Sequence, residues 1–298
     1  MTLWKPKTLS LFPLRNWFKY RKDFLLVWLL RGLSAIAGIV ILLILGFLLR
    51  EALPVLEEVG ITAFFRDDSW NPGEKSYNLV PMIWGTGLTM MGAVLLATPL
   101  GIVSALFCHY YAPMPIASLY RRLIELLAGI PSVVYGFWGL VVLVPLINRL
   151  HPPGTSLLAG IAVLTLMILP TITLVADASF AKVPPEYLMG AAAMGLSSWG
   201  TIWQIVIPSA KSGLFTGVIL ETGRAIGETM AVLMVCGNVV QTPDSIFDPV
   251  RTLTANIALE MAYALDNHRS ALFVSGLLLL GVIIVLAIAA ELVDREAS

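Results

Sequence analysis

The sequence predicts an all-α, polytopic membrane protein with six transmembrane helices. Three observations support this class. The 298-residue chain is 58% hydrophobic and only 13% charged, its mean hydropathy is +0.85, and its apolar residues form runs long enough to cross a bilayer. Because about a quarter of the residues in a soluble domain are charged, this composition excludes a soluble domain of the same length. The net charge of +0 carries no information about nucleic-acid or acidic partners, and no nucleic-acid partner is expected.

Six apolar runs are predicted to span the membrane. They cover residues 32–49, 79–107, 123–147, 157–175, 213–237 and 271–292. Pro99, Pro131 and Pro170 lie inside three of these runs, and we expect kinks there because proline removes a backbone hydrogen bond. The first run is longer than the apolar core of a signal peptide and no small-residue cleavage pattern follows it, so we expect a retained helix.

The distribution of charge predicts the orientation. Seven basic residues and one acid precede residue 32, whereas residues 51–77 carry six acids and two basic residues. The positive-inside rule therefore places the N-terminus in the cytoplasm, and six crossings return the C-terminus there. Cys108 and Cys236 then lie on opposite sides of the membrane. We expect no disulfide, because a bridge needs Cα atoms within ~7 Å.

This topology predicts one transmembrane domain, over residues 32–292, that carries two polar loops. The outer loop covers residues 51–77 and the cytoplasmic loop residues 180–212. A cytoplasmic segment of residues 1–31 precedes the domain, and a tail of residues 293–298 follows it.

The run of residues 213–237 contains three charged residues, Glu221, Arg224 and Glu228. On one continuous helix they fall within ~60° of one another and share a face. Arg224 lies eleven residues into the run, so at ~1.5 Å per residue it is ~16 Å deep, near the midplane of a bilayer. Charge at that depth must be paired or face water. Spacing favours a polar pathway over a structural ion pair of Arg224 with Glu228 or Glu221.

The cytoplasmic loop predicts two short helices outside the membrane. Pro184 and Pro185 suit a helix start, Gly195 suits the left-handed end of a helix, and Ser197 or Ser198 can cap the next helix. An ordinary pair of amphipathic interfacial helices would show the same composition.

This loop resembles the EAA loop of ABC-importer permeases. Gly195 matches the motif glycine, and Ile205-Val-Ile-Pro208 matches its close. Gly190 and Ala191 stand where the motif has its two alanines, while Met189 replaces its glutamate. The resemblance implies that Gly190, Ala191, Gly195 and Pro208 belong to a coupling helix that docks on an ATPase subunit.

Three further stretches resemble the PstC-type permeases of phosphate importers. They are Phe64-Phe65 with Trp70-Asn-Pro72, the run Glu125-Leu-Leu-Ala-Gly-Ile-Pro-Ser-Val-Val-Tyr-Gly-Phe-Trp-Gly139, and Gly223-Arg-Ala-Ile-Gly-Glu-Thr-Met-Ala-Val232. The resemblance implies a type I ABC-importer permease fold that forms half of an ATP-driven phosphate path. It also implies three partners: a second permease, an ATPase dimer and a periplasmic phosphate-binding protein. Membrane lipid surrounds the chain, and no cofactor is implied.

The resemblance also implies roles for the charged face. Arg224 and Glu228 match the fifth-span Arg and Glu that are implicated in phosphate passage in the family. A guanidinium offers a permanent, forked set of donors to an oxyanion, and Glu228 can pair with Arg224 when no anion is present. Glu221 lies outside the family pattern, and we expect it to be a structural partner of Arg224.

The sequence supports several other classes of function less well than it supports a permease. The chain lacks a Gly-x-x-x-x-Gly-Lys-Ser/Thr loop, so its energy must come from a partner. It has no HExxH or Gly-x-Ser-x-Gly motif, which argues against an intramembrane enzyme, and its histidines lack metal-ligand spacing. A permease for another oxyanion and an ATP-independent anion transporter or channel stay open as alternatives.

Four other residues have simpler interpretations. Asp177 is expected to be a solvated residue at the cytoplasmic end of the fourth span. Trp70 suits either a contact with a binding protein or an interfacial anchor. Tyr135 and Trp138 are expected to pack between helices.

Overall fold

A computed structural model describes the backbone of residues 14–297 and the side chains of residues 26–289, 291 and 292. The chain divides into two compact units, Met1–Arg50 and Glu51–Ser298. Parts of the predicted N-terminal segment and C-terminal tail therefore lie outside the described residues.

The first unit consists of the larger part of helix α1 (Leu14–Val59). Its apolar side chains from Leu26 onward are nearly all exposed, and the run from Leu26 to Val59 has a mean hydropathy of 2.7. A helix that is apolar on all sides is suited to lipid or to another membrane helix. The helix is longer at both ends than the predicted span of residues 32–49.

The second unit is helical apart from one small hairpin. Its elements are α2 (Ala63–Arg66), β1 (Trp70–Asn71), β2 (Ser76–Tyr77), α3 (Val80–Leu106), α4 (Met114–Ala128), α5 (Ser132–Trp138), α6 (Val144–Asn148), α7 (Leu157–Phe180), α8 (Pro185–Ala193), α9 (Ser198–Thr201), α10 (Ile207–Gly227), α11 (Met230–Val235), α12 (Leu253–Glu260) and α13 (Asp266–Ala297). The two strands pair antiparallel, with Trp70 opposite Tyr77.

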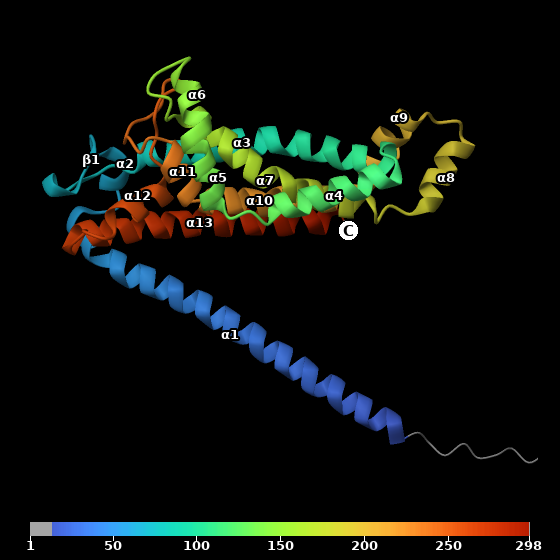
Figure 1. Cartoon of the computed structure of the whole chain (residues 1–298). Helices are drawn as coiled ribbons and strands as arrows, with labels where there is room; N and C mark the ends of the chain where they lie inside the picture. The colour runs from blue at the N-terminus through green and yellow to red at the C-terminus, as the bar shows by residue number, and fades with distance from the viewer. Residues whose placement is uncertain (1–13, 298) are drawn as a thin grey trace, which may run out of the picture. The chain divides into compact units, whose positions relative to one another are not determined.

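The long helices α3, α7, α10 and α13 run side by side and form the body of the second unit (Figure 1). Helices α8 and α9 lie at one end of this bundle, and β1, α2 and α12 lie at the other (Figure 1). Small residues allow the helices to approach closely, as membrane helices commonly do. At Gly101 of α3, for example, a Cβ atom would lie 2.7 Å from Ile172 of α7.

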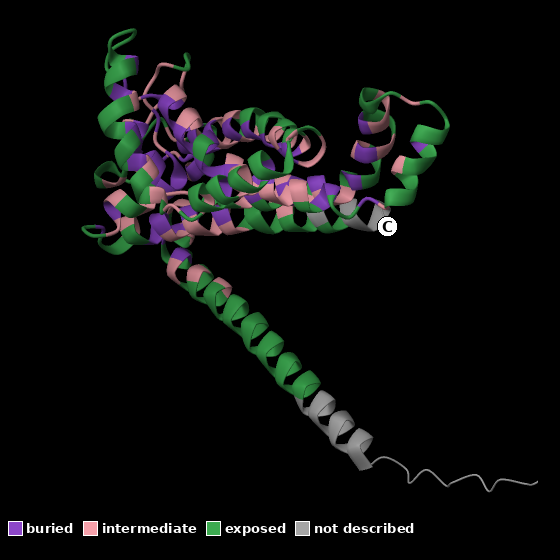
Figure 2. Cartoon of the chain, turned by 45° about the vertical axis from the view of Figure 1, so that its right-hand side comes forward, coloured by how far each residue is buried: buried purple, intermediate pink, exposed green. Residues whose placement is uncertain are grey.

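Burial follows this arrangement. Figure 2 shows the buried residues concentrated inside the bundle and at its hairpin end, while much of the outer surface is exposed. At the hairpin end, Phe64, Tyr77, Leu79 and Leu272 form one apolar cluster. In the middle of the bundle, side chains from α3 and α7 pack against Ala225 of α10. The apolar exposed surface is what a chain surrounded by lipid and partner helices requires.

The number of spans agrees with the prediction. In the described part of the chain, five helices are long and apolar enough to cross a membrane, and six if one bent pair forms a single span. The fourth and sixth extend beyond their predicted ends, to Phe180 and Ala297. Mean hydropathy is 2.0 or more in four of the five, but only 1.2 in the segment Ser198–Gly227, which includes α10.

The bent pair is the predicted third span. A kink at Pro131 is confirmed, but the bend between Met114–Ala128 and Ser132–Asn148 is 91°, and the first arm begins nine residues before the predicted start. Pro131 cannot continue the hydrogen-bonding of α4, and it directly precedes α5. At Pro99 and Pro170, by contrast, α3 and α7 continue through the proline.

Candidate functional site

The predicted fifth span is broken at the charged residues. Helix α10 ends at Gly227, Glu228 is extended (φ −67°, ψ 126°), and α11 starts at Met230. The prediction of one continuous helix carrying Glu221, Arg224 and Glu228 on a shared face is therefore wrong for Glu228. A break inside a membrane segment is tolerated only where other groups satisfy the freed backbone atoms.

Side chains satisfy the backbone at this break. Glu228 Oε1 accepts a hydrogen bond of 3.1 Å from the amide of Ala231, in the first turn of α11. The carbonyl oxygen of Glu228 accepts one of 2.9 Å from the hydroxyl of Thr254 on α12. The hydroxyl of Thr229 donates to the carbonyl of Gly227 at 3.2 Å. The carboxylate that sequence spacing directed toward Arg224 instead accepts from a free amide in the first turn of α11.

Arg224 has different partners from those predicted. Its Nη1 donates to Thr171 Oγ1 of α7 at 3.3 Å and lies 3.7 Å from Glu221 Oε2. The ion pairs among the described side chains include this contact but none between Arg224 and Glu228, so the predicted i,i+4 pairing is absent from this conformation. Its cause is the break, which ends the helical spacing between residues 224 and 228.

Glu221 is the buried member of its pair. Its side chain is 8% exposed, whereas that of Arg224 is 39% exposed. Glu221 Oε2 has no hydrogen-bond donor among the described residues. Burying a carboxylate is costly unless a counter-charge is near, and the geometry places Arg224 as that counter-charge. Thr171 and Glu221 thus hold the guanidinium through Nη1, while more than a third of the Arg224 side chain stays accessible.

Helix α12 contacts the break and α3 together. The amide of Leu253 donates to Thr86 Oγ1 of α3 at 3.0 Å, and Thr252 caps the helix by accepting from the amide of Ala255. Together with the Thr254 hydrogen bond, these contacts fix the first turn of α12 between α3 and the start of α11.

A buried polar cluster at the far end of α12 was missed by the sequence analysis. The carboxylate of Glu260 accepts from Arg251 Nη1 at 2.6 Å and from Trp70 Nε1 at 2.9 Å, and it lies 2.8 Å from His268 Nε2. Trp70 is buried, with its indole N–H used inside the chain. Both predicted roles for Trp70, a binding-protein contact and an interfacial anchor, are therefore replaced by an internal one. These residues share no sequence spacing from which a cluster could be predicted.

A second, partly buried polar cluster lies toward the opposite end of the bundle. Asp177 accepts from Arg121 Nε at 2.8 Å and Nη2 at 3.0 Å, and it lies 3.1 Å from His109 Nδ1. The prediction that Asp177 is a solvated boundary residue is wrong, because its side chain is only 17% exposed. This two-pronged ion pair ties α4 to α7.

The cytoplasmic loop has the predicted turn. Pro185 is in the first turn of α8, Gly195 is left-handed (φ +74°), and Ser197 caps α9 by accepting from the amide of Gly200. The second helix is not short, however, because α9 continues through a π-helical turn into α10.

The four predicted coupling residues occupy different environments. Ala191 is buried, while Gly190, Gly195 and Pro208 are exposed. They lie near α8, α9 and the start of α10, away from the break. Large apolar side chains are exposed around them. These are Tyr187, Met189, Met194, Trp199 and Trp203.

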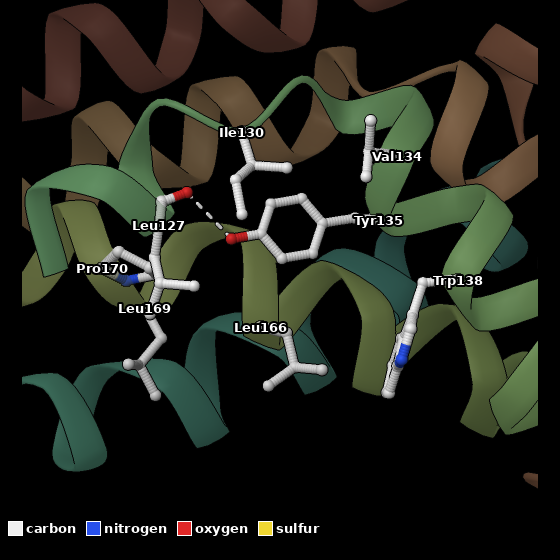
Figure 3. Close-up of a pocket in the computed structure, with 8 residues that line it drawn as sticks. All are labelled: Leu127, Ile130, Val134, Tyr135, Trp138, Leu166, Leu169 and Pro170. Atoms are coloured by element: carbon white, nitrogen blue, oxygen red, sulfur yellow. Dashed lines mark hydrogen bonds between the residues drawn. The ribbon is translucent and has the colours of Figure 1, made fainter. Parts of the chain in front are cut away.

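The bend between α4 and α5 encloses an apolar pocket of about 350 Å³ (Figure 3). Tyr135 projects into it, and its hydroxyl donates to the carbonyl of Leu127 at 2.9 Å. Trp138 also lines it and is 43% exposed. The predicted packing between helices is thus confirmed for Tyr135 but only partly for Trp138. Nothing polar in this pocket suits an anion.

Both cysteines are free, as predicted, and both are buried. Among the described residues, no group of three His, Cys, Asp or Glu side chains is arranged to hold a metal ion.

Comparison with known proteins agrees with this architecture. Residues 97–298 match the family model described as "Binding-protein-dependent transport system inner membrane component". The chain is 36% identical over 286 residues to the phosphate transport system permease protein PstC of Mesorhizobium japonicum, with 87% of each chain covered. It is 43% identical over 204 residues to the probable ABC transporter permease protein YqgH of Bacillus subtilis, with 67% of this chain and 66% of that protein covered.

Two solved structures share the fold at low sequence identity. A chain of a bacterial alginate ABC transporter, in complex with an alginate pentasaccharide-bound periplasmic protein, superposes with a TM-score of 0.65 at 15% identity, over 92% of this chain and 96% of that one. A chain of the MetNI methionine ABC transporter in an inward-facing conformation superposes with a TM-score of 0.59 at 15% identity, over 74% of this chain and 96% of that one.

Proposed function

The chain belongs to the family of binding-protein-dependent transport system inner membrane components, and from this premise we propose that it forms half of the membrane path of an ATP-driven phosphate importer. Relatives named as phosphate transport permeases, 36% identical over most of their length, support the choice of phosphate. The observation that carries the proposal is the accessible guanidinium of Arg224 beside a break in a membrane helix.

Arg224 suits an oxyanion for physical reasons. Its guanidinium is permanently charged and presents several N–H donors in one plane, which matches the oxygens of a phosphate. Thr171 and Glu221 engage Nη1, so other donors can turn toward a ligand. A passing anion must bind weakly enough to leave, and the neighbouring carboxylates of Glu221 and Glu228 keep the local charge from becoming strongly positive.

We assign Glu228 a role in the path through the break. Its carboxylate caps α11 and its carbonyl is held by α12. Movement of α11 relative to α10 would therefore shift Glu228 and change what Arg224 faces. Glu221 is proposed to be a structural partner that keeps Arg224 oriented.

The source of energy is proposed to be a separate ATPase dimer. The sequence has no phosphate-binding loop of the Gly-x-x-x-x-Gly-Lys-Ser/Thr type. The exposed turn at Gly195, with Gly190, Ala191 and Pro208 around it, is proposed to dock on that dimer. ATP binding would then move α8 and α9 and open the path to the outside, and hydrolysis would reset it. A second permease and a periplasmic phosphate-binding protein complete the assembly, with both termini in the cytoplasm.

The proposal is tested by reconstituting the chain with its three partner subunits in liposomes. We expect phosphate uptake that requires ATP and the binding protein. Replacing Arg224 with Gln should reduce uptake by more than about 30-fold, the equivalent of about 2 kcal/mol, while the complex still assembles. Arg122→Gln, which changes an exposed arginine of α4, is the matched control.

Three results would contradict the proposal in different ways. Uptake of sulfate or another oxyanion in preference to phosphate would show that phosphate is not the preferred substrate. Anion flux down a gradient without ATP, by the chain purified alone, would replace the importer by a channel or secondary transporter. Normal uptake by R224Q would remove Arg224 from the path.

A further inference from the structure

A pocket of about 600 Å³, lined by both apolar and polar side chains, lies between α7 and α10, toward the end of the bundle that carries α8. Its polar lining side chains come from both helices and from the residue that follows Ala181. They are Ser179, Lys182, Ser209, Ser212 and Thr216. Lys182 is the one charged side chain among the lining residues. The pocket is therefore positive and rich in hydroxyl groups, with no acid in its wall.

Small residues create this space. Ala178 of α7 and Gly213 of α10 both line it. Gly213 packs directly against Ser179, and a Cβ atom at Gly217 would lie 2.6 Å from Val175. The two helices thus approach closely along one edge, and the hydroxyl-bearing residues stand beside that line of contact.

The pocket and the Arg224 site lie at different levels of the same two helices, α7 and α10. Thr171, which accepts from Arg224, lies eleven residues before Lys182 on α7 and its extension, and Gly213 lies eleven residues before Arg224 on α10. Since α7 and α10 run antiparallel, both paths lead the same way, over a rise of ~16 Å. The pocket and Arg224 therefore lie on the same pair of helices, ~16 Å apart along their axes.

The hydroxyl groups and the lysine of this pocket differ in position. Serine and threonine side chains in spanning helices commonly form hydrogen bonds at helix–helix contacts, whereas Lys182 lies two residues beyond the end of α7 at Phe180 and is exposed. The acid nearest to Lys182 in sequence, Asp177, is held by Arg121 and His109. The charge of Lys182 is thus not neutralised from that side.

We propose that this pocket is a second, low-affinity site for a phosphoryl anion, occupied between release from Arg224 and escape to the cytoplasm. This inference rests on the proposed function. Lys182 attracts the anion, and the hydroxyls of Ser209 and Thr216 replace part of its water. The hydroxyl of Thr216 already donates to the carbonyl of Ser212, so its contribution to an anion is weak, as a transit site requires.

The first test measures occupancy without relying on transport. Ser209→Cys places a thiol in the pocket, and the natural cysteines are buried. In the assembled importer in detergent, we expect an anionic methanethiosulfonate reagent to label this thiol about 5-fold faster than a cationic one, because the pocket is positive. Inorganic phosphate at millimolar concentration should slow the labelling. Adding Lys182→Gln should abolish both effects, and Ser118→Cys, an exposed position outside the pocket, should show neither.

Labelling of the same thiol distinguishes free inorganic phosphate from a lipid headgroup as the occupant of the pocket. Protection by inorganic phosphate in a lipid-free detergent supports a transit site. Protection only by phosphatidylglycerol, with none by inorganic phosphate, would identify a lipid headgroup site and overturn the proposal. Equal labelling by both reagents, unaffected by Lys182→Gln, would overturn it as well.

Transport provides the second test. Lys182→Gln should lower the phosphate delivered per ATP hydrolysed about 5-fold, and Lys182→Glu should lower it further, since local charge governs the arrival of ions. Lys211→Gln, an exposed lysine of α10 outside the pocket lining, is the matched control and should behave as the unmodified chain. If R224Q abolishes uptake while both Lys182 variants transport normally, this inference fails and the proposed function stands. If the unmodified complex moves no phosphate, the proposed function fails.

Discussion

The hydroxyl of Thr254 on α12 donates a hydrogen bond of 2.9 Å to the carbonyl oxygen of Glu228, at the break between α10 and α11. Twenty-six residues separate the two positions in the chain. One side chain of α12 thus satisfies a backbone group that a continuous helix would have satisfied by itself. The backbone geometry at the candidate anion site therefore depends on a hydrogen bond from an uncharged side chain of α12.

We expect Thr254→Val to destabilise the complex by about 1–3 kcal/mol, because the shape is kept while the partly buried carbonyl of Glu228 loses its donor. A lower thermal midpoint of the purified complex, with slower phosphate uptake, would be the result. Thr254→Ser keeps the hydroxyl and should remain close to the original. Equal stability of the two variants would mean that the hydrogen bond contributes nothing.

Glu221 and Arg224 should be energetically coupled. The effects of Glu221→Gln and Arg224→Gln on thermal stability are expected to be less than additive in the double variant, by about 0.5–1 kcal/mol. This value is small because Arg224 is partly exposed and solvent screens the pair. The measurement is a double-mutant cycle on the assembled complex. Strict additivity would show that the 3.7 Å approach has no energetic effect.

Glu260 should be the most sensitive acid at its end of the bundle. Glu260→Ala leaves Arg251, whose side chain is only 18% exposed, without its carboxylate, and removing one partner of a buried pair costs about 3–5 kcal/mol. We expect poor assembly or a large fall in the thermal midpoint. Glu74→Ala, at an exposed position of the outer loop, should be neutral. A mild effect of Glu260→Ala would show that the ion pair with Arg251 contributes little to stability.

Asp177→Asn should loosen α4 from α7. The change removes the charge that accepts both Arg121 hydrogen bonds, and hydrogen bonds to charged groups contribute about 1.5–3 kcal/mol. Hydrogen exchange in α4 should rise, as measured by mass spectrometry of the complex. Glu186→Gln, an exposed carboxylate in α8, is the control. Unchanged protection of α4 in the Asp177 variant would contradict the role given to this pair.

Gly195→Ala should weaken the attachment of the ATPase. Gly195 has φ +74°, a conformation that costs a residue with a Cβ atom about 1–2 kcal/mol. The turn between α8 and α9 would be strained or rearranged, so less ATPase subunit should copurify with the permease. Gly200→Ala, where φ is not positive, should retain it. Full ATPase binding by the Gly195 variant would show that the conformation of this turn does not determine attachment of the ATPase.

The sequence was sufficient to predict the number of spans and the turn at Gly195, because each depends on local properties of the chain, and the absence of a disulfide followed from the order of the spans. Apolar run length determines a span, and a glycine followed by a capping serine determines the turn. Even the kink at Pro131 follows from one residue. Its size does not, because the angle depends on packing of both arms against α7.

What the sequence did not predict depends on contacts between distant segments. The spacing of Arg224 and Glu228 implied a pair only if the helix continued, and the break is stabilised by Thr254 from another helix. In the same way, Asp177 looked like a boundary residue until Arg121 and His109, more than fifty positions away, were seen to surround it. Long-range hydrogen bonds leave no periodic trace in a single sequence.

The low mean hydropathy of the segment Ser198–Gly227, 1.2 against 2.0 or more for the other candidate spans, has a consequence for biogenesis. A segment that carries Glu221 and Arg224 is a poor substrate for insertion by itself, since each such charge costs about 2.5–3.5 kcal/mol at the centre of a helix. We expect this segment to remain in the translocon until it packs against α7, which covers its polar face. Its entry into the bilayer would then be a cooperative event that follows the order of synthesis along the chain.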